Sequence, residues 1–191
     1  MSISASGAVS LNTIHTEAGG SSGTTCSLGD SDIRAIIGNS SGANNMNAYR
    51  GHDNELTLSC GQDTITVNKT DYDYNGVANV TNGISMGSWT DASTNAGGTT
   101  RSINSFYTAL NGTLPEMIIP GNTSSTSFSN LFGYSKVKSG SNVYFDSTLS
   151  VSINYSSANN TTSYSNGVTS ETAGVLASFP SSGSVTVKFS N

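Results

Sequence analysis

The chain has 191 residues and a formal net charge of −5, and only 10% of its residues are charged. Its seven basic residues are scattered, so the sequence offers no basic stripe that could neutralise phosphates, and we expect no nucleic-acid partner. No apolar run approaches the ~20 residues that a membrane-spanning helix needs, and we expect no membrane insertion.

Serine, threonine, asparagine and glycine make up more than half of the chain. The 34% of hydrophobic residues fall in short regular runs, which indicates a folded protein and not a disordered one. So few charges favour a surface covered by partners or by copies of the same chain. Residues 1–6 lack the charged and apolar regions of a secretion signal, so we expect synthesis and assembly in a cytoplasm.

Two short helices are predicted in the first 40 residues. Residues 12–20 are predicted to form a helical turn that ends at a glycine. In the second helix Asp30 is expected to accept a first-turn N–H as the N-cap, Asp32 adds negative charge to the first turn, and Gly38 ends the helix.

The second helix carries an apolar stripe. Ile33, Ile36 and Ile37 fall at positions i, i+3 and i+4, so they share one face. A helix this short does not persist alone. We therefore expect the three isoleucines to be buried, either in their own domain or against a neighbouring subunit.

From about residue 53 the pattern changes to strands, so we divide the chain into an N-terminal segment, 1–52, and a β domain, 53–191. Residues 56–58 and 65–67 alternate between apolar and polar side chains, and the glycine-led residues 61–63 between them predict a hairpin turn. Residues 103–110 and 128–132 are each predicted to form one or two helical turns, the second ended by Gly133.

Two C-terminal segments alternate most clearly, and we expect their apolar residues to line one core: Leu149, Val151, Ile153, Tyr155, Val185, Val187 and Phe189. Several further short apolar runs lie between glycine, asparagine and serine clusters. The fold class we predict is mainly β, an antiparallel β-sandwich or jelly-roll-like domain preceded by a small N-terminal segment with short helices.

No catalytic constellation is visible, and we expect no enzyme activity, cofactor or metal. The two histidines, His15 and His52, have acidic neighbours but lack the spacing of a zinc site or of a nucleophile and its base. Cys26 and Cys60 are expected to be buried thiols, although a disulfide between them stays open.

Residues 71–76 alternate carboxylates and tyrosines before an Asn-Gly pair. Asp71, Asp73 and Asn75 match an oxygen-rich calcium loop only in part, because no glutamate follows. A polar turn between strands is the better interpretation. A third interpretation is contact with sugars by Tyr72 and Tyr74, with Trp89 as a further candidate for that role.

The order and spacing of four segments in residues 8–52 resemble a segment near the N-termini of bacteriophage virion proteins, especially tail and tail-fibre proteins. These segments are residues 12–17, 27–34, 41–46 and 49–51. The resemblance implies an attachment device that recurs in several virion proteins. It covers about a quarter of the chain.

The resemblance implies a phage virion structural protein, in the first instance a tail component (tail fibre, tail tip or adaptor), located in the virion. Its partners would be other virion proteins and copies of itself in a homo-oligomer, and its docking residues would be Ile33, Ile36, Ile37, Met46 and Tyr49. The alternatives are a head decoration protein or a tail module that binds host surface glycans. A wall-degrading enzyme is disfavoured because no catalytic constellation is visible.

Overall fold

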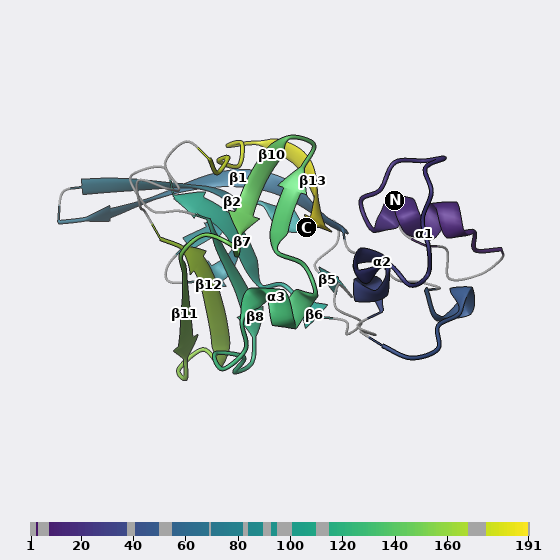
Figure 1. Ribbon diagram of the computed structural model, residues 1–191. Coiled ribbons are helices and arrows are strands. Elements are labelled where there is room, and N and C mark those ends of the chain that lie inside the picture. The colour runs from purple at the N-terminus through teal and green to yellow at the C-terminus, as the bar shows by residue number, and fades with distance from the viewer. Residues whose placement is uncertain are drawn as a thin grey trace.

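The structure is a computed structural model that describes residues 3, 8–37, 41–49, 55–68, 70–81, 84–89, 93–94, 101–109, 115–167 and 175–190. The fold is mainly β, as predicted: one strongly curled antiparallel sheet, a half-barrel, follows a few short N-terminal helices (Figure 1). The helices lie at one end of the molecule. The hairpin of β1 (Glu55–Val67) and β2 (Thr70–Thr81) projects from the opposite end.

The described helices are short, and they are α1 (Leu11–Glu17), α2 (Ser31–Ile36), the 3-10 helix η1 (Met46–Tyr49) and α3 (Phe128–Phe132). Helix α1 begins after Ser10, whose hydroxyl accepts the Thr13 N–H at 3.1 Å. Asp30 is the N-cap of α2, but the capping bond we expected is wrong. Its carboxylate accepts the N–H of Ser27 at 2.8 Å instead and stabilises the preceding turn. The predicted stop at Gly38 lies outside the described residues.

The described strands are β1 (Glu55–Val67), β2 (Thr70–Thr81), β3 (Ile84–Met86), β4 (Ser88–Trp89), β5 (Ser93–Thr94), β6 (Arg101–Ser102), β7 (Ser105–Ala109), β8 (Glu116–Pro120), β9 (Lys136–Ser139), β10 (Asn142–Asp146), β11 (Val151–Ser156), β12 (Thr161–Asn166) and β13 (Gly183–Ser190). Their main path is β10-β9-β13-β1-β2-β7-β8-β12-β11, with β3 on β2 and β4 on β1. Strands β5 and β6 pair separately.

Strand β1 connects the two halves of the curled sheet. Its first half, from Glu55 to Cys60, pairs with β13, and its second half, from Gly61 to Val67, pairs with β2. The predicted turn at residues 61–63 is therefore wrong, because β1 continues through it. The chain reverses after Val67 instead, where Asn68 has a φ of +51°. Residues 71–76, expected as a polar turn, belong to β2.

Three glycines permit this change of partner within β1. Gly61 pairs with Gly76 of β2, and Gly87 crosses both at the junction of β3 and β4. A Cβ on Gly87 would lie 2.5 Å from the carbonyl oxygen of Ser59 and 2.6 Å from that of Gly76. Because rigid backbone approaches from two strands, only glycine fits at this crossing.

A side chain joins β10, the strand at one end of the sheet, to β12, the next-to-last strand at the other end. Asn166, at the end of β12, accepts the N–H of Asp146 at 3.1 Å and donates to the Asp146 carbonyl at 2.7 Å. Asp146 ends β10 and pairs with Lys136 at 3.2 Å. Burial acts to raise the pKa of Asp146, but hydrogen bonds from Thr148 and the nearby Lys136 outweigh it and lower that pKa. Asn166 thus replaces a backbone ladder where β10 and β12 meet.

Helix α3 fills the concave side of the half-barrel with aromatic rings. The Phe128 ring centroid lies 4.3 Å from that of Phe145 on β10 and 6.0 Å from that of Phe189 on β13. The helix was predicted, and it ends as expected at Gly133, which has a φ of +73°. The core inside the curl is therefore built around this helix.

The core expected from the C-terminal alternation is confirmed for most of its residues. Val187 and Phe189 are fully buried, and Val151 and Ile153 pack half-buried against the same core. Two residues are exceptions: Leu149 is half-buried outside this core, and Tyr155 is 37% exposed. Tyr155 lies on β11 at the end of the sheet, where the core-facing side ends.

The helix predicted for residues 103–110 is wrong, because the structure has β7 there. All five side chains of β7 are buried: Phe106 belongs to the main core and Tyr107 to a second cluster. That cluster also contains Ala78, Ile84, Met86 and Ile118. A strand covered on both faces gives a continuous apolar run, which does not distinguish helix from strand.

We expect Gly87→Ala to destabilise the protein by about 3 kcal/mol or more, because it adds a backbone clash to a strained φ. Gly140→Ala is the matched control, since Gly140 has a similar φ of +57° with no atom within 4 Å of an added Cβ. The control should cost about 1 kcal/mol. Denaturant unfolding measures both, and equal losses would contradict the role of the crossing.

Candidate functional site

The expected docking residues are mostly used inside the chain. Ile33 and Tyr49 are fully buried, Ile36 is buried, and Ile37 packs half-buried against the main core. Burial, above all, raises the pKa of Tyr49, whose hydroxyl accepts a hydrogen bond from the Asn44 amide. Met46 is the exposed member of the set, at 41%. The isoleucine stripe is thus buried by its own chain, one of the two outcomes we expected.

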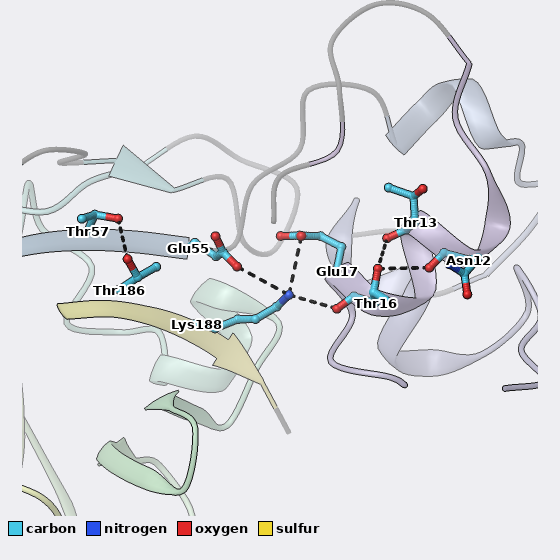
Figure 2. A network of polar contacts seen from close by, with 8 residues as sticks. All are labelled: Asn12, Thr13, Thr16, Glu17, Glu55, Thr57, Thr186 and Lys188. Atoms are coloured by element: carbon cyan, nitrogen blue, oxygen red, sulfur yellow. Dashed lines mark hydrogen bonds and ion pairs between the residues drawn. The ribbon is translucent and has the colours of Figure 1, made fainter. Parts of the chain in front are cut away.

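A polar junction attaches α1 to the sheet (Figure 2). The Lys188 ammonium on β13 donates to the Thr16 carbonyl at 3.0 Å and lies 3.5 Å from the Glu17 carboxylate and 3.8 Å from that of Glu55. Glu17 is fully buried. A buried carboxylate is costly without a countercharge, so Lys188 fixes the position of α1 on the sheet.

The two tyrosines considered for sugar contact share one face of β2, whereas Trp89 lies in different surroundings. Tyr72 and Tyr74 lie on β2, and Tyr74 packs edge-on against Tyr107 with ring centroids 5.7 Å apart. Trp89 lies on β4 and packs against the main core, whereas Tyr74 packs against the second cluster. The structure therefore does not gather them into one aromatic surface.

The carboxylates considered for calcium are engaged in the β1–β2 hairpin. Asp73 accepts a hydrogen bond from Thr64, and Asp71 accepts one from Thr66, both at 2.7 Å. Asn75 is buried and donates to the Phe179 carbonyl at 3.1 Å. In the part of the chain that the structure describes, no three His, Cys, Asp or Glu side chains cluster as a metal site would require.

The remaining candidates for chemistry are the two histidines and the two cysteines. The His15 ring contacts the Thr24 hydroxyl at 2.8 Å, and His52 lies outside the described residues. Both cysteines are free thiols, which resolves the question of a disulfide; Cys60 is buried as expected, whereas Cys26 is only half-buried. Burial raises the pKa of Cys60 to about 11, so its thiol stays protonated and unreactive near neutral pH.

A polar groove lies on the outer side of β8, β12 and β11. Its volume is about 200 Å³, and it is lined by Glu116, Ile118, Asn154, Tyr155, Ser156, Asn159, Thr161 and Ser163. The strand register explains the depression: Ser163 lies between Ile118 on one side and Asn154 on the other, so a small residue separates larger ones. Asn159 forms one side of the groove and belongs to the turn after β11. In this turn the Tyr155 hydroxyl donates a hydrogen bond to the Asn160 side-chain oxygen at 3.1 Å.

Glu116 is the one acidic residue in the groove lining. The buried Tyr107 hydroxyl donates a hydrogen bond to its Oε2 atom. Burial, followed by the adjacent carboxylate, raises the pKa of Tyr107 far above its ordinary value, so Tyr107 remains a donor. This contact holds the carboxylate in place through Oε2.

The chemistry of the groove suits a ligand with many hydroxyl groups. Asn154 and Asn159 each offer a donor and an acceptor, the serine and threonine hydroxyls offer both, and Ile118 provides an apolar patch. No basic residue lines the groove. Sequence reasoning missed it because Glu116 and its partners on β11 and β12 are about 40 residues apart, and serines and asparagines occur throughout this chain.

No family model matches the chain, and no curated protein or solved structure shows significant similarity to it. The resemblance of residues 8–52 to phage virion segments therefore stays a prediction. Among the described helices, none has the length and apolar character needed to cross a membrane.

Proposed function

We propose that the chain is a structural protein of a bacteriophage virion, placed in the tail and attached through residues 1–52. The observation that carries this proposal is the separation of the helical segment from the β1–β2 hairpin at opposite ends of the molecule (Figure 1). Attachment at the helical end would leave the far end of the sheet free to face outward.

The junction at Lys188 supports the proposal. It holds α1 against β13 and β1, so a particle that binds the helical segment also orients the sheet. Because Ile33, Ile36 and Tyr49 are buried within the chain, the attachment surface consists of exposed residues. Among the described residues of this segment, Met46 is the exposed large apolar one. For the fold we propose a sandwich-like architecture in which the two half-sheets that share β1 face each other across the α3 core.

We expect Met46→Asp to reduce incorporation of the chain into phage particles without lowering its stability, because this side chain is 41% exposed. Met46→Leu is the control and should assemble normally. Ile36→Asp should instead unfold the segment, since it places a charge in the core. Quantitative immunoblots of purified particles measure incorporation, and denaturant unfolding measures stability.

Normal incorporation of Met46→Asp would exclude η1 as the attachment surface. Immunogold labelling of the intact particle tests the location. Label on the tail supports the proposal, and label on the head would replace it with a head decoration protein. A particle without this chain would contradict any structural role.

A second candidate function is the binding of a neutral glycan on the host surface. The Glu116 groove favours it, because one fixed carboxylate, two amides and several hydroxyls match the hydroxyl groups of a sugar ring. Its volume, below the ~300 Å³ at which drug-sized sites begin, suits a single sugar ring. The negative charge of Glu116 and the absence of basic lining residues disfavour acidic sugars.

We expect Glu116→Gln to weaken binding of neutral oligosaccharides by about tenfold or more, because it removes the charged acceptor. Asp73→Asn is the matched control, since it removes one carboxylate from the hairpin and not from the groove. Titration with neutral and sialylated oligosaccharides, followed by NMR, measures the affinity. Unchanged affinity for Glu116→Gln, or preference for the sialylated probe, would contradict this assignment.

A further inference from the structure

Strand β11 has an unoccupied edge in the part of the sheet that the structure describes. It pairs with β12 on one side, and no other described strand pairs with it. The opposite end of the sheet differs. There the Val143 carbonyl of β10 accepts the Ala177 N–H at 2.7 Å, and Asn166 binds the backbone of Asp146.

The β11 edge lacks the features that prevent strands from pairing. Exposed edges in soluble proteins are usually protected by charged residues, prolines or bulges. No charged residue and no proline occurs between Asp146 and Glu171. The register of β11 with β12 is regular over six residues. Within the described part of the chain, the backbone donors and acceptors along the outer edge of β11 are therefore available to another strand.

The side chains of β11 identify what that strand would be. Val151 and Ile153 are half-buried at the margin of the main core, and Tyr155 is 37% exposed, whereas Ser152 and Asn154 are exposed on the other face. An antiparallel copy of this pattern places apolar residues beside apolar ones and polar residues beside polar ones. A shift by one residue would destroy the match. The strand is thus complementary to itself.

We propose that β11 pairs antiparallel with β11 of a second copy of the chain, about a two-fold axis through Ile153. In this register Ile153 faces its own equivalent, Val151 faces Tyr155, and Ser152 faces Asn154. The contact is isologous, so it closes after two copies. It joins two curled sheets into one continuous sheet and covers the apolar margin on both. The inference goes beyond the proposed function, since it depends on the strand edge and not on a virion.

Charge pairs at two exposed positions test this register. In S152K/N154K, each introduced lysine faces a lysine of the second copy, so the dimer dissociation constant should rise about tenfold or more. In S152K/N154E, each lysine faces a glutamate, and dimerisation should stay near the wild-type level. Sedimentation equilibrium of the full chain measures the dissociation constant, and circular dichroism confirms that each variant is folded.

The control is S157K/A158K, which adds the same two charges to the exposed turn after β11 and should leave dimerisation unchanged. A monomeric wild-type chain would overturn the proposal. Equal dimerisation of S152K/N154K and wild type, or equal loss in S152K/N154K and S152K/N154E, would also overturn it, because both results place the contact elsewhere or exclude this register.

Discussion

The close crossing of three backbones at Gly61, Gly76 and Gly87 is the constraint on which the sheet depends. Here β1 leaves its pairing with β13 and begins its pairing with β2, while the β3–β4 junction passes over both. A side chain at Gly87 would meet carbonyl oxygens from two strands, and backbone cannot move aside as a flexible side chain can. Because β1 belongs to both halves, the sheet curls around one core instead of separating into two sheets.

The remaining features follow from that curl. Bending brings β10 and β12 close enough for the Asn166 amide to bind the backbone of Asp146, and the concave side receives the aromatic rings of α3. Strand β11 lies beyond β12 at the end of the sheet, so its outer edge is unoccupied among the described strands. The outer faces of β8, β12 and β11 form the Glu116 groove. The candidate glycan site and the proposed dimer edge thus adjoin on β11 and share Asn154 and Tyr155.

The sequence patterns predicted correctly those features that depend on residues close together in the chain. The stripe of Ile33 and Ile36 is buried, α3 ends at Gly133, and Val187 and Phe189 line the core. The errors arose where distant segments decide the structure. Gly61 resembles a turn residue in sequence, but its lack of a side chain serves a crossing with Gly87, 26 residues away. Strand β7 reads as a helix because it is covered on both faces. The groove was not predictable, since its members meet only through the register of three strands.

Native-state hydrogen exchange of the β1 amides tests most directly whether the sheet is one unit joined at the glycine crossing. Amides between Glu55 and Cys60 report on the half that pairs with β13, and those between Gly61 and Val67 report on the half that pairs with β2. If the crossing unites them, the slowest amides of both halves exchange with the same free energy, equal to that of global unfolding. Exchange of one half at a clearly lower free energy would contradict the account, because it would mean that the two halves open independently.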